Sequence, residues 1–382
     1  MRRTTRTTAA LATALVVPGL LGACAGTAVP GEPVTGAYLA AGCPAEIRIR
    51  TDASPRVEQA ALYQLLAEGF EIDVAGRSVS GPMIVDGADT GIRLVIESGD
   101  PYGPTGADVL YGDDPPLLAQ VDADDALRDL TRTPTVAIFA PLERDPAVVF
   151  WDPSYYEVPS IATLGISFAD DGQPVLIRGG AHDYALDFLV GSSLIVPEQA
   201  DRIGDGTLDD FIAADGALAQ IGDATIDPYV LEHSEAWDRE IEYDLLEEAG
   251  YPRYAAMLSA VPADVSRYAD CFALLVPALQ QATVDFYADP DRTTAAIVQL
   301  AQTFGHAEYT LDLAENALRL LRQRGIVGNG GNHWVGDVAT GRMQRFIDEA
   351  TAAFRAANLS VVDGVRTQDL ATDAFIDTEI GF

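Results

Sequence analysis

The stretch PTVAIFAPLERDPAVVFWDP at residues 134–153 contains two apolar segments joined by a short polar one. The segments 135–140 and 147–151 are rich in Val, Ile, Ala and Phe and have the length of buried strands. Further segments that predict strands are 47–50, 91–96, 108–111 and 174–178. Because helical spacing of apolar residues follows several of these segments, the pattern predicts an α/β protein with a buried parallel sheet.

The pattern changes beyond residue 255, where strand-like segments become rare. Leu311, Ala314, Leu318 and Leu321, for example, recur at the spacing of one helix face. The segments that predict helices in this part are 262–280, 291–303, 308–323 and 340–357. The sequence therefore predicts a helical C-terminal segment, interrupted by a loop rich in Gly and Asn at 325–336.

Composition limits the possible partners. The 382 residues predict two or three domains, and 58 acidic against 24 basic residues give a net charge of −34. Such a charge repels nucleic acid and anionic lipid headgroups, so neither is expected as a partner. All basic residues are arginines, which excludes a phosphate-loop or Schiff-base lysine, and no G-x-S-x-G or H-E-x-x-H motif occurs.

The N-terminus predicts export. Arg2, Arg3 and Arg6 precede an apolar segment at 9–21 that is too short to span a bilayer. The segment ends in Leu-Gly-Ala before Cys24, as in a lipoprotein signal peptide. We therefore expect removal of residues 1–23, a lipid on Cys24 that holds the protein at the outer face of the cell membrane, and a flexible tether within 24–44. The alternative is a plain secretory peptide with an incidental cysteine.

Two cysteines remain in the mature chain, Cys43 and Cys271. An even pair in an oxidising compartment favours a disulfide, which would tie the start of the fold to its C-terminal third. The alternative is a pair of free buried thiols.

The stretch at 134–153 resembles the first crossover of ABC-transporter substrate-binding proteins of the nitrate/sulfonate/taurine-like group, which includes binders of thiamine-pyrimidine precursors. Other stretches similar to this family are IRGGAHDYALDF (177–188), AQIGDATIDPY (219–229), YPRYAAMLS (251–259), GIVGNG (325–330) and GDV (336–338). The resemblance implies a two-lobed, periplasmic-binding-protein-like fold of type II with two crossovers. Lobe 1 would comprise 45–140 plus 256–382, and lobe 2 would comprise 141–255.

The resemblance also implies a function. A monomeric, lipid-anchored protein would capture a small organic molecule in the cleft between the lobes and deliver it to an ABC permease, without a cofactor, a metal or catalysis. The alternatives are a binding or sensory lipoprotein without a transporter, a pyrimidine-synthase-like enzyme of the same fold, and an extracytoplasmic hydrolase.

Ligands of α/β proteins bind beyond the carboxyl ends of parallel strands, where loops meet helix N-termini. The residues expected on this ground to contact the ligand are Thr51, Asp52, Tyr111, Asp113, Asp114, Trp151, Gly179, Gly180, Ala181, Asp183, Tyr184, Asp227 and Tyr229. Most of these side chains are acidic or aromatic, which favours a neutral or cationic solute, including an aromatic one, over nitrate or a sulfonate.

Several of these residues have an alternative role. Gly179 and Gly180 either let a ligand approach the backbone amides or form a tight turn. Asp183 either contacts ligand or caps a helix, and Trp151 either stacks on a flat ligand or lies in the core. His182 is expected to make a polar contact or a cap rather than to bind a metal, because no second His or Cys is placed near it.

Overall fold

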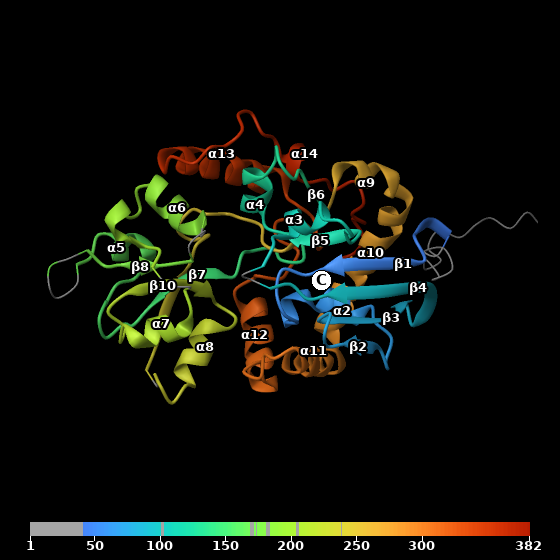
Figure 1. Ribbon diagram of the computed structural model, residues 1–382, viewed down its shortest axis with the longest axis horizontal. Helices are drawn as coiled ribbons and strands as arrows, with labels where there is room; N and C mark the ends of the chain where they lie inside the picture. The colour runs from blue at the N-terminus through green and yellow to red at the C-terminus, as the bar shows by residue number, and fades with distance from the viewer. Residues whose placement is uncertain are drawn as a thin grey trace, which may run out of the picture. The chain divides into compact units, whose positions relative to one another are not determined.

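The larger of two sheets is built from the N-terminal strands and one strand from later in the chain (Figure 1). Its strands, in spatial order, are β2 (Glu71–Asp73), β3 (Ser78–Val85), β4 (Ala88–Glu97), β1 (Glu46–Arg50), β5 (Leu118–Val121), β12 (Met257–Ala260) and β6 (Val136–Phe139). β1 runs parallel to β4 and β5, whereas β12 runs antiparallel to β5 and β6. The sheet is therefore mixed, not parallel as the apolar segments predicted.

The smaller sheet uses the middle of the chain. Its strands, in spatial order, are β11 (Glu242–Leu245), β7 (Ala147–Trp151), β10 (Ala219–Asp223), β8 (Ile177–Arg178) and β9 (Ala200–Asp201). β10 pairs antiparallel with β7 and parallel with β8. On one side of this sheet Phe150, Phe211 and Trp237 form an aromatic cluster. The ring centroids of Phe150 and Phe211 are 4.9 Å apart, and those of Phe211 and Trp237 are 4.8 Å apart.

These elements belong to a computed structural model that describes residues 41–100, 103–168, 172, 174–180, 184–203, 206–237 and 239–382, all within one compact unit of the chain. Two connections join the two sheets. Residues 140–146 lead from β6 to β7, and residues 246–256 lead from β11 back to β12. The two connections contact each other, since Arg144 Nε donates to Glu247 Oε2 at 2.6 Å. The two lobes and two crossovers that the sequence predicted are confirmed.

Helices cover both sheets. Their bounds are η1 (Val57–Gln59), α2 (Ala60–Gln64), α3 (Gly106–Leu110), α4 (Ala123–Arg128), α5 (Ile161–Gly165), α6 (Tyr184–Gly191), η2 (Pro197–Gln199), α7 (Leu208–Ala213), α8 (Asp227–Glu232), α9 (Pro262–Arg267), α10 (Ala269–Ala288), α11 (Asp291–Thr303), α12 (Leu311–Gln323), α13 (Thr340–Ala356) and α14 (Thr367–Leu370). The predicted helical C-terminal segment is confirmed. Within the part of the chain that the structure describes, no helix is both long and apolar enough to cross a membrane.

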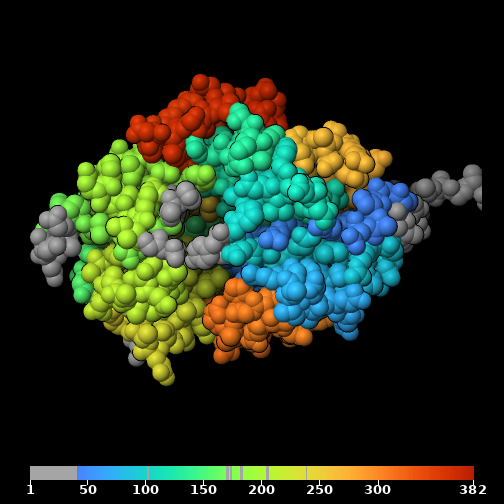
Figure 2. Space-filling model, in the orientation of Figure 1, coloured from blue at the N-terminus to red at the C-terminus, as the bar shows by residue number. Residues whose placement is uncertain are grey.

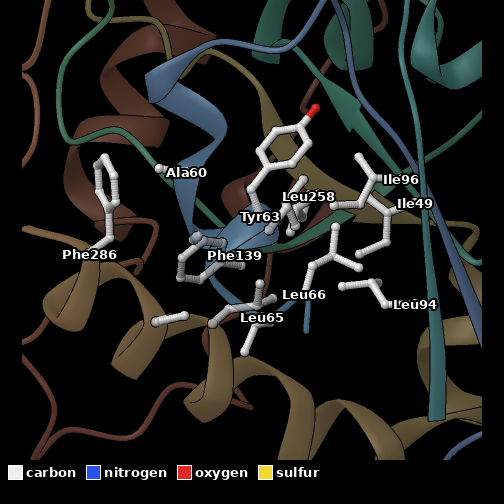
Figure 3. Packing of buried hydrophobic residues seen from close by; sticks show 14 of the residues in the cluster. Ile49, Ala60, Tyr63, Leu65, Leu66, Leu94, Ile96, Phe139, Leu258 and Phe286 are labelled. Carbon is white, nitrogen blue, oxygen red and sulfur yellow. The ribbon is translucent and has the colours of Figure 1, made fainter. Parts of the chain in front are cut away.

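The core of the first lobe lies between the larger sheet and the helices. Alternate residues of β1 and β4, such as Ile49 and Leu94, are fully buried and point toward α2 and α10 (Figure 3). Leu65 and Phe139 fill the space between them in the same cluster. The alternation that predicted the strand at 47–50 arises because one face of the sheet packs on these helices.

The helix α13 packs mainly on the second lobe's helix α6, although it follows helices that cover the larger sheet. The rings of Tyr184 and Phe354 lie 5.8 Å apart across this contact. Gly191 is required here, because a Cβ on it would lie 1.9 Å from the carbonyl oxygen of Ala353. The division of the chain between the lobes at residues 140 and 256 stays a prediction.

A disulfide joins Cys43 to Cys271, as predicted, with the two Cα atoms 4.6 Å apart. It links the segment before β1 to the buried face of α10, where Cys271 is fully inaccessible. The bond therefore fixes the start of the folded part against the C-terminal helices.

Local structure differs from the prediction in several places. Residues 108–111, expected as a strand, belong mostly to α3, whose N-cap Thr105 accepts a hydrogen bond from the Asp108 amide. A segment of four residues is too short for its periodicity to distinguish a strand from a helix. Of the strand expected at 174–178 only Ile177–Arg178 is present. The strands β2, β3, β5, β9, β11 and β12 were not predicted.

Candidate functional site

A cavity of about 360 Å³, within the range of small-molecule sites, is lined by both lobes and both crossovers. Its described lining residues are Asp52, Arg56, Glu58, Gln59, Asp122, Asp124, Asp125, Leu142, Asp145, Pro146, Ala147, Tyr184, Ala185, Ile221, Gly222, Asp223, Leu246, Arg253, Ala255 and Ala256. Figure 2 shows the surface hollowed where the green and yellow second lobe meets the cyan and blue part of the first. The site lies where the ends of β1, β5 and β10 approach one another.

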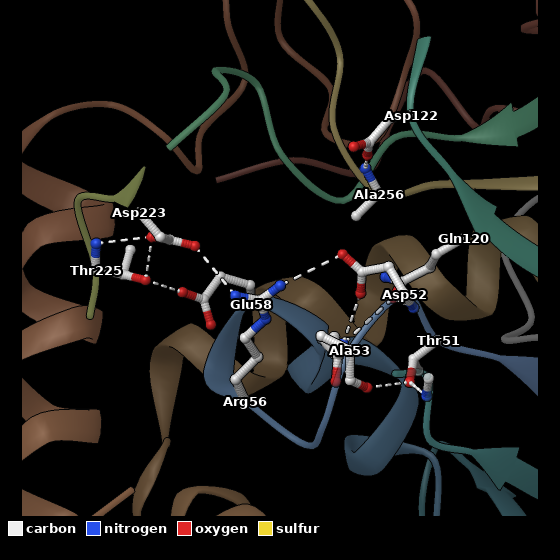
Figure 4. A network of polar contacts seen from close by, with 12 residues as sticks. Thr51, Asp52, Ala53, Arg56, Glu58, Gln120, Asp122, Asp223, Thr225 and Ala256 are labelled. Atoms are coloured by element: carbon white, nitrogen blue, oxygen red, sulfur yellow. Dashed lines mark hydrogen bonds and ion pairs between the residues drawn. The ribbon is translucent and has the colours of Figure 1, made fainter. Parts of the chain in front are cut away.

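Arg56 bridges the two lobes at one side of the cavity (Figure 4). Its Nη1 lies 3.1 Å from Asp223 Oδ2, at the end of β10, and its Nη2 lies 3.4 Å from Asp52 Oδ2, just after β1. The Thr225 hydroxyl lies within hydrogen-bond distance of the Glu58 carboxylate and 2.6 Å from Asp223 Oδ1. These contacts hold the two lobes together over the cavity.

Arg253 occupies the opposite side, on the second crossover. Its Nε lies 2.5 Å from Asp145 Oδ2, and its Nη1 lies 2.9 Å from Asp124 Oδ2 and 3.2 Å from Asp122 Oδ2. The Tyr251 hydroxyl donates to Asp124 Oδ2 at 2.8 Å. Because Asp124 and Asp145 are almost fully buried, their charges depend on this arginine.

Some polar atoms of residues that line the cavity lack a partner among the described residues. Glu58 is 8% exposed and Gln59 is 2% exposed, yet Glu58 Oε2 and Gln59 Oε1 accept no hydrogen bond there. A buried acceptor left unpaired costs about 1–3 kcal/mol. Both oxygens are enclosed by the protein, so they record a cost of burial and do not form a contact surface. The side chain of Asp125, which is partly exposed and lines the cavity, likewise has no hydrogen-bond or ion-pair partner among the described residues, and its carboxylate can meet a ligand.

Burial of the acidic side chains changes their pKa values. Burial raises the pKa of Asp122 to about 6. The charge of Arg253 lowers this pKa, whereas the charges of Asp124 and Asp52 raise it further. Burial also raises the pKa of Asp125 and of Glu58. Behind the cavity wall, burial raises the pKa of Asp227 to about 7, although its carboxylate accepts a hydrogen bond from the Asp223 amide at 2.7 Å. Each of these carboxyl groups would gain from a positive charge brought into the cavity.

The carboxylate atoms of Asp122, Asp124 and Asp125 lie within 4.8 Å of one another, a spacing that a cation could bridge. Two of the three, however, are already paired with Arg253. The cavity's described lining has carboxylates and guanidinium groups but no Ser, Cys, His or Lys that could act as a nucleophile.

Two of the residues that the sequence predicted as ligand contacts, Asp52 and Tyr184, line this cavity. Thr51 lies beside it, buried, with its hydroxyl donating to the Ala53 carbonyl at 2.7 Å. The Gly179 amide donates to the Asp201 carbonyl, so this amide is used within the protein. Gly180 has open space around it.

The other predicted contacts lie away from the cavity's lining. Tyr111 is exposed and donates to the Pro134 carbonyl, and Asp114 pairs with Arg48 at 2.9 Å. Asp113 lies exposed in the same turn. A contact between these residues and a ligand stays a prediction.

Tyr229 stacks on His233, with ring centroids 3.9 Å apart. Trp151 is 2% exposed within the core of the second lobe's sheet and helices. Ala181, His182, Asp183 and Cys24 lie outside the described residues. The contacts predicted for Tyr229 and Trp151 also stay predictions.

Sequence reasoning missed most of the charged lining. Asp122, Asp124 and Asp125 follow β5, and they would have been found by the same rule as Asp52 had LLAQV at 117–121 been taken as a strand. Arg253 could not have been found in this way, because it lies on the second crossover, which only the assembled lobes bring to the cavity. Arg56 lies in the same loop as Asp52 but was not singled out.

No protein-family model matches the sequence, and a search of curated proteins finds no match. Solved structures do match in fold. The alkanesulfonate-binding protein SsuA from Xanthomonas axonopodis pv. citri, bound to MOPS, is 14% identical, with a TM-score of 0.52 over 86% of this chain and 98% of that one. The periplasmic nitrate-binding protein NrtA from Synechocystis PCC 6803 is 10% identical, with a TM-score of 0.51 over 87% of each chain.

A third match is a Candida albicans protein described as having the generic periplasmic binding protein fold. It is 11% identical, with a TM-score of 0.51 over 88% of this chain and 98% of that one. Similarity at these identities shows the fold: the chain has the two-lobed periplasmic binding protein fold that the sequence predicted. Its structural neighbours include ABC transporter substrate-binding proteins of the sulfonate and nitrate group.

Proposed function

We propose that the protein captures a small solute in the cavity between its lobes, outside the cell, and delivers it to an ABC importer. The observation that carries the proposal is that residues from both lobes and both crossovers line one cavity. A solute that contacts both lobes binds the closed state better than an open one, so it shifts the population toward closure. The functions named for the structural neighbours, alkanesulfonate binding and nitrate binding, support the same class of function for this chain.

A screen of metabolites against the purified protein tests this proposal. At least one compound is expected to raise the melting temperature, because a solute at 100 times its dissociation constant stabilises the folded state by about 2.7 kcal/mol. Ala255→Leu, which fills part of the cavity, should abolish that shift, whereas Ala352→Leu on the exposed face of α13 should preserve it. Conversion of the bound compound into a product would contradict the proposal and favour an enzyme of this fold.

We further propose that a lipid on Cys24 anchors the protein at the outer face of the cell membrane. The sequence before Cys24 supports this, as does the tether-like composition of the residues that follow. Cys24→Ala is expected to move the protein from the membrane pellet to the soluble extracytoplasmic fraction, whereas the Cys43→Ala/Cys271→Ala double variant should stay in the pellet. If Cys24→Ala still sedimented with membranes, the anchor would be elsewhere.

A further inference from the structure

The charge of the cavity is strongly one-sided. Seven of its described lining residues carry carboxylates, and only two, Arg56 and Arg253, carry guanidinium groups. The acidic residues are Asp52, Glu58, Asp122, Asp124, Asp125, Asp145 and Asp223. A low-dielectric cavity lined mainly by one charge attracts solutes of the opposite charge.

Both arginines are already engaged within the protein. Arg56 binds Asp52 and Asp223, and Arg253 binds three further aspartates. An anionic solute such as a sulfonate needs hydrogen-bond donors or cations that are free to meet it. Among the side chains of the described lining, the remaining donors are the Tyr184 hydroxyl and the Gln59 amide, which already binds Asp52 and Gln120. These side chains are therefore poorly suited to an anion.

The partnerless atoms are hydrogen-bond acceptors, which defines what a solute must supply. Glu58 Oε2 and Gln59 Oε1 have no donors among the described residues, but both atoms are enclosed, so a solute in the cavity does not contact them. In Figure 4 one oxygen of Glu58 faces Thr225 while the other points away from the drawn partners. The carboxylate of Asp125 is partly exposed, lines the cavity and has acceptors that no described residue uses. A solute with N–H donors and a positive charge would pair with this carboxylate and offset the charge of the others.

The walls favour an organic cation over a metal ion. Leu142, Ile221, Leu246 and Ala255 give the cavity apolar surface, and its volume of about 360 Å³ falls in the range of small-molecule sites. A metal ion instead needs several oxygens converging on one point, and Arg253 already occupies two of the three clustered aspartates.

We propose that the solute is a small aliphatic amine or polyamine, whose ammonium groups bind Asp125 and lie among the other carboxylates of the lining while its carbon chain lies against the apolar walls. This inference rests on the proposed solute-binding function and specifies its ligand class. Primary ammonium groups fit better than quaternary ones, because only the former donate hydrogen bonds to carboxylate oxygens.

Calorimetric titration of the full protein with putrescine and spermidine tests the inference. Both are expected to bind, and tetramethylammonium, which has the charge but no N–H, should bind at least tenfold more weakly. Glu58→Gln and Asp125→Asn should each weaken amine binding at least tenfold, while Glu68→Gln, exposed and outside the cavity, should not change it. The two variants lie on different elements, and the melting curve of each shows whether it is folded. A folding defect in one variant therefore leaves the other as a valid test.

The pH dependence provides a further readout. Asp122 faces Asp124, Asp52 and Arg253 and has a pKa of about 6 because it is buried. Protons compete with a bound cation for such a group, so amine affinity should fall as the pH is lowered through this value. A solute held by neutral or basic groups would not show this fall.

The outcomes distinguish this inference from the function on which it rests. Binding of MOPS or nitrate without amine binding would overturn the cationic ligand and support solute capture. Binding of Mg²⁺ or Ca²⁺ alone would also overturn it, as would amine binding that neither cavity variant weakens. If no amine binds and no compound of the metabolite screen does, both the ligand class and the proposed function are wrong.

Discussion

Arg253→Ala is expected to destabilise the protein by about 3–5 kcal/mol, the usual cost of removing one partner from a buried ion pair. Asp124 and Asp145, whose side chains are 2% exposed, would then keep their charges in the interior without a counter-ion. The loss should be large because the same guanidinium group serves both carboxylates and also contacts Asp122. Urea unfolding of the variant and the wild type measures the difference.

An arginine on the surface provides the control. Arg345→Ala, exposed on α13, should change stability by no more than about 0.5 kcal/mol. Adding Asp124→Asn to Arg253→Ala should recover part of the loss, because it removes one of the unpaired charges. A loss under 1 kcal/mol (the typical contribution of an exposed ion pair) would show that this cluster is not buried.

Removing the disulfide is expected to cost about 3–5 kcal/mol. Cys43 and Cys271 are separated by 228 positions, and a cross-link over so long a loop restricts the unfolded chain by about 5 kcal/mol in the chain-entropy description. The double variant Cys43→Ala/Cys271→Ala should show this loss in urea unfolding.

Reductant separates the effect of the bond from that of the side chains. It should lower the stability of the wild type nearly to that of the double variant and leave the double variant unchanged. Labelling of the unfolded, unreduced wild type should find neither thiol free. If reductant had no effect on the wild type, the two cysteines would not be joined in the protein as purified.

Much of the fold could be predicted because it depends on local patterns. The alternation in Ile47-Arg-Ile-Arg50 predicted β1, and the two apolar segments in 134–153 predicted β6 and β7, whereas the crossover between them was implied by the family resemblance. A strand buried on one face shows alternating apolar residues, and a strand buried on both faces shows a continuous apolar segment, so both patterns can be recognised in the sequence. The strand β5 and the helix α3 were missed, because each is short and neither shows the regular alternation of β1 or lies beside a second apolar segment as β6 does.

The candidate site was predictable only where a polar residue followed a recognised strand. Asp52 was found for this reason, and Asp122 was missed because the strand before it was missed. Arg56 could not be assigned a role from its neighbours, because its partner Asp223 lies 167 positions away on the other lobe.

The sequence by itself determined the α/β class, the helical C-terminal segment and the excess of negative charge, because each follows from composition or from patterns within one segment. It favoured a bond between the two cysteines, and the structure joins them. Only the tertiary structure decided which of the 58 acidic residues face the cavity and which arginines neutralise them. The reason is physical: the strength of a charge interaction depends on distance and burial, and folding brings together residues from both lobes that the chain holds far apart.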